Sequence, residues 1–275
     1  MQPSVSVVIP TWNRAHTIER AIDSALRQSL PVLEVLVCDD GSTDDTDSVV
    51  ASIAKQDARV RWIEGKRGGR PAIPRNRGLR ESRGDWLAFL DSDDEWLPDK
   101  LKLQLEAARA LGSLAVCSNA IRVDVDRNEL GVLLDWDHAR LKFGDLLAVN
   151  RVVCSSSVFH RSLLSKVGGF REEPEFKHLD DYVFWLRVAA LTDFAYCGGA
   201  LVHYRDDPKH SIRSDQSIPP EEAQRILVFG ATRSWLVKSE LGATRRLAAL
   251  ASLELGKFRI TSLTLARKLK RRLFR

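Results

Sequence analysis

The stretch from residue 5 to residue 14 reads VSVVIPTWNR. Its first five residues are mostly apolar and rich in β-branched side chains, and Pro10 follows them. Short apolar runs of this kind are typical of strands that are buried on both faces of a parallel sheet. Residues 15–28 then carry apolar side chains at positions 18, 21, 22, 25 and 26, which is the spacing of an amphipathic helix. The opening of the chain therefore predicts a strand followed by a helix.

The same strand–helix unit recurs three more times before residue 112. Apolar runs predict strands at 33–38, 60–64 and 85–90, and helical spacing predicts helices at 43–55, 72–83 and 98–111. This alternation is typical of a parallel sheet with helices on both faces. Ligands of such sheets bind beyond the carboxyl ends of the strands. We therefore expect the functional site at that edge.

From residue 114 onward the pattern is less regular and indicates a mixed sheet with loops. The expected strands are 114–122, 152–159 and 194–204, and the expected helices are 141–148, 161–167 and 180–191. Residues 205–219 are expected to form a loop, and the chain becomes helical after residue 220. We expect one domain over residues 1–219, with halves at 1–110 and 111–219. A helical extension follows over 220–275.

Charge is distributed unevenly along the 275 residues, whose net charge is +5. Residues 221–275 carry 13 Lys and Arg against four Glu, so they contribute +9 and the preceding 220 residues contribute −4. Leucines alternate with basic residues over 262–275, which is typical of an amphipathic helix on an anionic membrane surface. A solubilising helix with a charged outer face is the alternative.

The remaining composition gives weaker constraints. Hydrophobic residues make up 44% of the chain and charged residues 29%, an ordinary globular balance. The four cysteines form no CxxC pair and lie in apolar contexts, which favours reduced, buried thiols over a zinc site. No signal peptide and no membrane-spanning segment are expected from the sequence.

Acidic residues follow two of the predicted strands. Asp91, Ser92 and Asp93 come directly after the strand at 85–90. Carboxylates that converge at a strand end suit Mg²⁺ or Mn²⁺, whose coordination phosphates often complete. Asp39 and Asp40 end the strand at 33–38 and could accept hydrogen bonds from a base or a ribose. Each pair has a plain alternative, because acidic residues before a helix also cap its N-terminus.

The order of the polar segments is more specific than any one of them. The chain reads IPTWNR at 9–14, VCDDGSTDDT at 37–46 and IPRNRGLRESRGDWLAFLDSDDEW at 73–96. In this order the chain resembles the inverting family-2 glycosyltransferases of the GT-A fold. Their recurring segments are P-x-x-N, DDGS-x-D, an A-R-N-x-G-like helix and D-x-D-D. The resemblance is close from residue 4 to about residue 110.

The resemblance implies a fold and a donor site. The fold is GT-A, a Rossmann-like nucleotide-diphospho-sugar transferase with a mixed sheet and helices on both faces, here with a C-terminal helical extension. The metal, Mn²⁺ or Mg²⁺, falls on Asp93. The donor, a nucleotide sugar and by resemblance a UDP-sugar, would be bound by Pro10, Thr11, Asn13, Asp39, Asp40, Arg75, Asn76, Asp91 and Asp180.

A second, looser part of the resemblance concerns the catalytic base. A G-G-F segment at 168–170 precedes Asp180 and Asp181, which match the family's E-D-x-D-L-W-L-R segment. The family's general base falls on Asp181, whereas Asp180 stands where the family usually has Glu. Capping of the following helix is the alternative for this pair. A later segment, with wider spacing than in the family, puts His210 forward as a metal ligand.

The function implied is transfer of a sugar, with inversion, to a hydroxyl of a glycan or lipid-linked acceptor in cell-surface polysaccharide or glycoconjugate synthesis. We expect a cytoplasmic enzyme that is peripheral on the inner face of the membrane and has no nucleic-acid partner. A catalytically inactive nucleotide-binding or membrane-associated scaffold of the same fold is the alternative. A sugar-nucleotide pyrophosphorylase would need a Gly-rich loop after the first strand, where this chain has IPTWNRAH.

Overall fold

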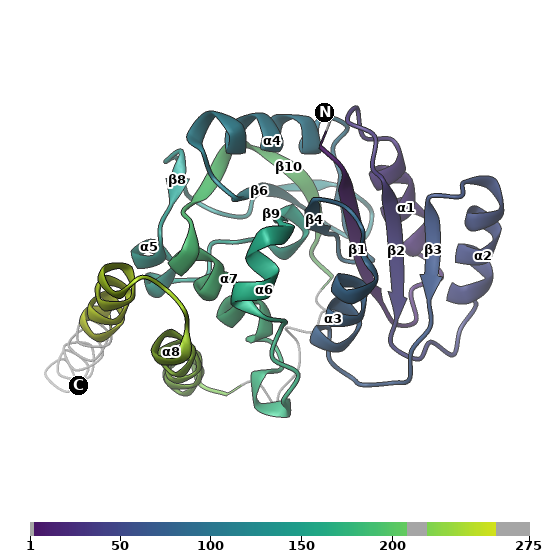
Figure 1. The fold of residues 1–275 in the computed structure, drawn as a ribbon. Helices are drawn as coiled ribbons and strands as arrows, with labels where there is room; N and C mark the ends of the chain where they lie inside the picture. Colours follow the sequence, from purple (N-terminus) through teal and green to yellow (C-terminus); the bar gives the residue numbers. More distant parts are fainter. Residues whose placement is uncertain (1–2, 208–218, 257–275) are drawn as a thin grey trace, which may run out of the picture.

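The structure is a computed structural model that describes residues 3–207 and 219–256. The basic segment 262–275 and His210 lie outside the described residues. Within the described part, no helix is long and apolar enough to cross a membrane. Figure 1 shows a central twisted sheet with helices against both of its faces and with the C-terminal helices at one end.

The first half of the sheet is parallel. Its strand order is β3-β2-β1-β4. These strands span Val60–Ile63 (β3), Glu34–Asp39 (β2), Val5–Thr11 (β1) and Trp86–Phe89 (β4). Because β1, β2 and β4 run in one direction, their carboxyl ends meet at one edge of the sheet.

The second half of the sheet is mixed and continues β4 in the order β9-β6-β10-β5. β6 (Ala115–Val123) and β10 (Phe194–Arg205) are parallel, while β9 (Val158–His160) runs antiparallel to both β4 and β6. β5 (Glu95–Trp96) pairs antiparallel with β10. Two short strands attach to this half, β7 (Glu129–Val132) on β6 and β8 (Arg140–Leu141) on β10.

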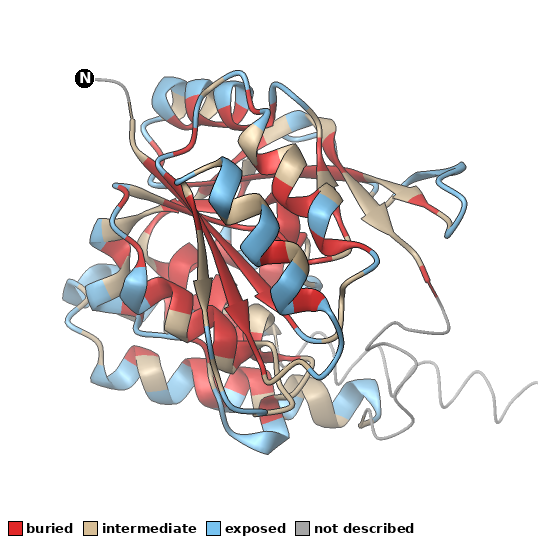
Figure 2. Cartoon of the chain, turned by 90° about the vertical axis from the view of Figure 1, so that its right-hand side faces the viewer, coloured by how far each residue is buried: buried red, intermediate tan, exposed pale blue. Residues whose placement is uncertain are grey.

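Two hydrophobic clusters divide the helices between the faces of the sheet. Alternate residues of β1 enter different clusters, as the two-residue period of a strand requires. The first face is covered by α1 (Ile18–Leu26), α2 (Thr46–Gln56) and α4 (Lys100–Leu111). The second face is covered by α3 (Ala72–Glu81), α5 (Phe143–Ala148), α6 (Leu164–Val167), α7 (Asp180–Leu191) and α8 (Glu221–Lys238). Figure 2 shows the buried sheet between helices whose outer sides are exposed.

Helix α3 packs unusually close to the sheet. A Cβ added at Gly78 would lie 2.4 Å from Val8 Cγ1 and 2.9 Å from the sulfur of Cys38. Contacts below 3.0 Å do not occur for real Cβ atoms, so only glycine allows this approach. Arg75 and Asn76 lie three and two residues earlier on the same helix, so the close packing also limits where they can lie.

The strands and helices expected before residue 112 are confirmed, with boundaries that shift by a few residues. In the second half, the strand expected at 152–159 is wrong over most of its length. A 3₁₀ turn (η1, Cys154–Ser156) occupies its centre, because the hydroxyls of Ser156 and Ser157 donate to Val153 and Cys154 carbonyls and compete with ladder pairing. Residues 161–167 form a 3₁₀ turn (η2, Arg161–Leu163) and then α6, rather than one helix.

The C-terminal helices join the main core. Val228, Phe229 and Leu236 of α8 are buried in the same hydrophobic cluster as α7. A further helix runs from residue 243 to residue 256. Of the four cysteines, three are buried and Cys197 is half-buried, and all are free thiols.

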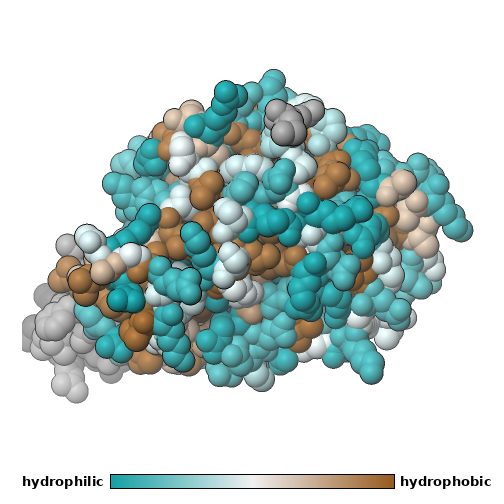
Figure 3. Space-filling model, in the orientation of Figure 1, coloured by the Kyte–Doolittle hydropathy of each residue, from teal (hydrophilic) through white to brown (hydrophobic). Residues whose placement is uncertain are grey.

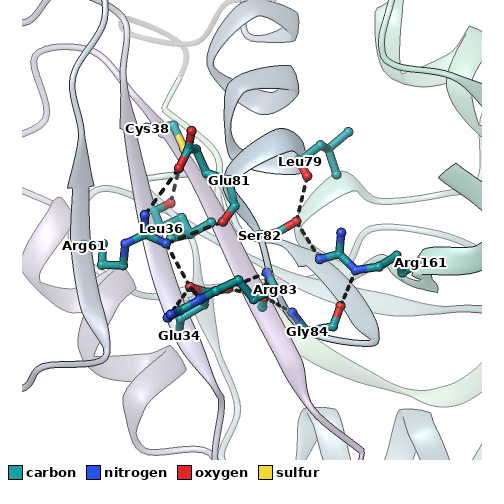
Figure 4. A network of polar contacts seen from close by, with 11 residues as sticks. Glu34, Leu36, Cys38, Arg61, Leu79, Glu81, Ser82, Arg83, Gly84 and Arg161 are labelled. Carbon is teal, nitrogen blue, oxygen red and sulfur yellow. Dashed lines mark hydrogen bonds and ion pairs between the residues drawn. The ribbon is translucent and has the colours of Figure 1, made fainter. Parts of the chain in front are cut away.

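A buried charge network lies at the end of the sheet opposite the strand carboxyl ends. Glu34 receives hydrogen bonds from Ser6, Arg61 and Arg83, and Figure 4 shows the two arginines beside it. The Glu34 side chain is fully buried. Burial alone would raise the pKa of Glu34, but these hydrogen bonds outweigh it and lower the pKa below its ordinary value. The carboxylate is thus charged, and it ties β1 and β2 to the turn before β4.

We expect Glu34→Gln to destabilise the protein by about 3 kcal/mol, because it leaves two arginines beside a buried neutral group. The lowered pKa also means that the contribution of Glu34 to stability is present above the ordinary glutamate pKa. It is lost as the pH falls through the folded-state value. Urea unfolding at pH 7 and pH 4 measures both effects. Glu81→Gln is the control, since that side chain is half exposed, and an equal loss in both variants would contradict the role of Glu34.

Candidate active site

The carboxyl ends of β1 and β2 carry a tightly bonded loop pair. Thr11 lies opposite Asp39 in the ladder, and the Asp40 N–H donates to the Thr11 carbonyl. The Asp39 carboxylate accepts from the backbone N–H of Gly41 at 2.8 Å and from the Ser42 hydroxyl at 2.6 Å. Its acceptor capacity therefore serves mainly the turn that follows β2.

Asn13 closes the same edge from the β1 side. Its backbone has a φ of 50°, a left-handed conformation that Asn tolerates better than most residues. Its N–H donates to the Ser42 hydroxyl, and its side-chain oxygen accepts from the Thr43 N–H at 2.8 Å. Pro10, one of the residues expected to bind the donor, lies opposite Cys38 in the ladder and is buried.

Asp40 contacts a loop that comes from the region between β3 and α3. The N–H groups of Gly68 and Gly69 each donate to its carboxylate at 2.8 Å, and Arg67 pairs with it. The Arg67 guanidinium also lies 3.8 Å above the centre of the Trp12 ring, which is 41% exposed. Arg67 thus contacts both the Trp12 ring and the Asp40 carboxylate at the carboxyl ends of the strands.

Arg75 connects the two halves of the sheet. Its guanidinium is buried and donates to Asp91, at 2.8 Å, and to Asp180, at 3.1 Å. Asp91 follows β4 in the first half, whereas Asp180 begins α7 in the second half. Residues from both halves of the chain therefore meet at one guanidinium.

Asp181 lies next to this ion pair and is partly exposed. One carboxylate oxygen accepts from the Tyr182 N–H at 2.6 Å, and the other faces the side-chain amide of Asn150 at 3.4 Å. Burial raises the pKa of Asp181 above its ordinary value, although Arg75 opposes the shift. Burial likewise raises the pKa of Asp180, to about 7. A carboxylate with a raised pKa is a better proton acceptor near neutral pH.

Asp93 and Asp94 follow Asp91 and have different surroundings. The Asp93 side chain is 34% exposed and has a loose ion pair with Arg14 at 3.6 Å. Burial raises the pKa of both carboxyls, and the neighbouring aspartates add to the shift. Asp94 is buried and accepts from the Ser155 hydroxyl and, at 2.9 Å, from the backbone N–H of Arg205. Asp93 is therefore available to a ligand, while Asp94 secures the loop.

A divalent cation on Asp93 would draw further ligands from substrate phosphates and water. No group of three or more His, Cys, Asp or Glu suited to a metal occurs among residues 3–207 and 219–256. Magnesium-type sites commonly use one or two carboxylates and complete the shell with substrate phosphates and water. A partly exposed Asp93 beside two other aspartates fits that pattern, because a cation would relieve their mutual repulsion.

Two residues near the candidate site use their side chains mainly to bond the backbone of other segments. The Asn76 amide bonds both the N–H and the C=O of Phe170 and also contacts Glu172. Trp96, which follows the aspartates in sequence, is 4% exposed, and its indole N–H donates to the Ser155 carbonyl at 2.6 Å. The donor-binding role of Asn76 stays a prediction.

Several residues at the site carry no signal in the sequence. Asn150 lies in the loop after α5 and reaches Asp181 across 31 positions. Ser155 accepts a hydrogen bond from the Asp91 N–H and donates one to Asp94, so it holds the aspartate loop in place. Only the tertiary fold brings these residues to the site.

Comparison with known sequences gives a consistent family. Residues 6–168, more than half of the chain, match the model of glycosyl transferase family 2. Over 139 residues the chain is 42% identical to the succinoglycan biosynthesis protein ExoO of Rhizobium meliloti, covering 50% of this chain and 39% of that protein. The chain thus spans less than half the length of this relative. It is 29% identical over 203 residues to the UDP-Glc:alpha-D-GlcNAc-diphosphoundecaprenol beta-1,3-glucosyltransferase WfgD of Escherichia coli, covering 73% of this chain and 76% of that protein.

Solved structures agree with the fold. S. aureus TarS in complex with UDP-GlcNAc superposes with a TM-score of 0.72 at 20% identity, over 93% of this chain and 72% of that chain. TarS in complex with UDP gives a TM-score of 0.68 at 19% identity, over 91% and 70%. The expected GT-A fold is confirmed. With the family match over residues 6–168, it follows that this chain belongs to glycosyl transferase family 2.

Proposed function

We propose that the chain transfers a sugar from a nucleoside-diphosphate sugar to a hydroxyl of a glycan or lipid-linked acceptor, with inversion, in cell-surface polysaccharide or glycoconjugate synthesis. The observation that carries the proposal is the Arg75 bridge. It brings Asp91, from the half that resembles a nucleotide-binding unit, next to Asp180 and Asp181. The names of relatives that act in succinoglycan synthesis and on a diphosphoundecaprenol-linked sugar support the acceptor class.

The donor would lie across the carboxyl ends of β1, β2 and β4. Asp40 and the Thr11 region would hold the base, with the exposed Trp12 ring beside them. Asp91 would contact the ribose, and Arg75 would add positive charge near the leaving diphosphate. UDP is the proposed nucleotide, since TarS was solved with UDP and with UDP-GlcNAc and since WfgD is named for UDP-Glc.

A Mn²⁺ or Mg²⁺ ion held by Asp93 would, when bound, neutralise the charge that develops on the departing diphosphate. His210, expected as a further ligand, lies outside the described residues. The loop itself is held by Asp94, which bonds Ser155 and the Arg205 backbone. Asp93 is thereby presented at the edge of the sheet in a fixed position.

Asp181 would take the proton from the acceptor hydroxyl as its oxygen attacks the anomeric carbon from the face opposite the diphosphate. A single in-line displacement inverts the anomeric centre. The raised pKa of Asp181 suits this role, and Asn150 and the Tyr182 N–H orient the carboxylate. Arg75 keeps the adjacent Asp180 ion-paired, so that Asp181 is the carboxylate of this pair left for the acceptor.

We also propose that the C-terminal end of the chain contacts an anionic membrane surface. Figure 3 shows hydrophobic side chains among polar ones around the two C-terminal helices. Ile226 and Val237 of α8 are 68% and 53% exposed, and Leu247 and Leu255 of the next helix are 65% and 66% exposed. The net charge of +9 over 221–275 favours an anionic surface. This arrangement suits an enzyme that is peripheral on the inner face of the membrane and uses a lipid-linked acceptor.

Replacing the proposed base tests the mechanism. We expect Asp181→Asn to lower transfer about 10³-fold, because an amide cannot accept the proton. UDP binding, measured by calorimetry, should change only a few-fold. Asp193→Asn, just beyond the other end of α7, is the control and should be fully active. An Asp181→Asn enzyme with wild-type turnover would remove Asp181 from the base role, and a wild-type protein that binds UDP but transfers no sugar would favour the inactive scaffold.

Removing divalent metal tests the role of Asp93. We expect a chelator to stop transfer and Mn²⁺ or Mg²⁺ to restore it, because the diphosphate then leaves with its charge neutralised. Asp93→Asn should raise the metal concentration needed for half-maximal rate, measured by titration of the metal into chelator-treated enzyme. Asp45→Asn, at the exposed start of α2, is the control. Full activity in excess chelator would refute the metal requirement.

A further inference from the structure

Three side chains outside the proposed donor site form a compact group, which we name the Trp136 cluster: Trp136, Arg151 and Tyr196. The Arg151 guanidinium lies 4.7 Å from the centre of the Trp136 ring. The Trp136 and Tyr196 rings meet edge to face with their centres 6.4 Å apart. The cluster joins the loop before β8, the segment before η1 and the strand β10.

Each member of the Trp136 cluster has a buried polar atom without a hydrogen-bond partner. These atoms are the indole nitrogen of Trp136, the Nε of Arg151 and the hydroxyl of Tyr196. A buried donor that stays unpaired is destabilising, so native proteins seldom leave one without a reason. Three polar groups without a hydrogen-bond partner thus lie in one cluster.

The chemistry of the cluster selects the kind of partner. The indole N–H and the guanidinium can only donate hydrogen bonds. Burial raises the pKa of Tyr196, so its hydroxyl keeps its proton and also has one to give. Arg151 adds a positive charge, and no ion pair joins it to a carboxylate in the part of the chain that the structure describes. The Arg151 guanidinium donates a 3.4 Å hydrogen bond to the Asp135 carbonyl. A donor-rich, cationic group of this kind is complementary to an oxyanion.

The position of the cluster relates it to the reaction. Arg151 directly follows Asn150, whose amide faces the Asp181 carboxylate. Tyr196 lies on β10, and its N–H donates to the Ala139 carbonyl in the loop that carries Trp136. The cluster is therefore linked to the proposed base through Asn150, the neighbour of Arg151 in sequence.

We infer that the Trp136 cluster is an oxyanion subsite for the acceptor, which binds a phosphate or carboxylate group next to the acceptor sugar. The inference rests on the proposed function for the word acceptor, but the oxyanion site itself can be measured without turnover. Arg151 supplies the charge, and the Tyr196 hydroxyl and Trp136 N–H turn toward the anion as it enters. Discrimination between charged and neutral acceptors would thus reside in these three side chains.

Binding to the full chain, saturated with UDP and Mn²⁺, tests the inference by calorimetry. The probes are octyl-linked GlcNAc-α-diphosphate, octyl glucuronide and neutral octyl GlcNAc. We expect the protein to bind one anionic probe at least tenfold more tightly than the neutral one, and the better probe identifies phosphate or carboxylate as the source of the oxyanion. Arg151→Gln should remove that preference and leave the affinity for the neutral probe unchanged. Arg140→Gln, the same charge change on β8, is the control and should keep the preference.

A second variant separates ligand binding from a structural role. Tyr196→Phe removes an unpaired hydroxyl and keeps the ring, so we expect an unchanged or higher melting temperature together with several-fold weaker binding of the anionic probe. Equal affinity of wild type and Arg151→Gln for both anionic probes would show that Arg151 binds no oxyanion and would overturn the inference. If the transfer rate does not depend on Arg151, the acceptor subsite is refuted and the proposed function still stands. If anion binding depends on Arg151 but the protein transfers no sugar, the proposed function is refuted and the oxyanion site still stands.

Discussion

The site depends on the two ion pairs that the Arg75 guanidinium forms. The guanidinium is buried and donates hydrogen bonds to Asp91 and Asp180, which belong to opposite halves of the fold. Two carboxylates brought this close would repel each other in the interior without a cation between them. Arg75 can occupy this place only because α3 lies against β1 and β2, and that approach requires Gly78. A packing constraint in the helix thus sets the distance between the proposed donor and base residues.

A second set of contacts holds the loop of aspartates that follows β4. Ser155 links the Asp91 backbone to the Asp94 carboxylate, and Asp94 bonds the backbone of Arg205 at the end of β10. These three hydrogen bonds hold the aspartate loop in place, while Asp93 remains partly exposed. Buried side chains hold the framework, and the partly exposed carboxylates are left for ligands. This division explains how neighbouring aspartates can have different roles.

The sequence alone predicts the first half of the fold well, because alternating apolar periods of a strand and a helix depend on local residues. It fails over 152–157, where serine hydroxyls bond nearby carbonyls and a turn replaces the expected strand. Motif order identifies the aspartates of the candidate site, but it cannot identify Asn150 or the Trp136 cluster. Those residues matter through contacts across tens of positions, which no local pattern records. The structure also shows Asn76 bonded to the Phe170 backbone, a partner that its motif does not suggest.

The central claim is that one arginine joins two halves into a single transfer site, and Arg75→Lys tests it most directly. Lysine keeps the charge but cannot donate in two fixed directions to both aspartates. The account predicts a folded protein whose transfer rate falls about 100-fold, because the carboxylates lose their relative position. Arg80→Lys, exposed on the same helix, should turn over like wild type. Wild-type transfer by the Arg75→Lys enzyme would contradict the account.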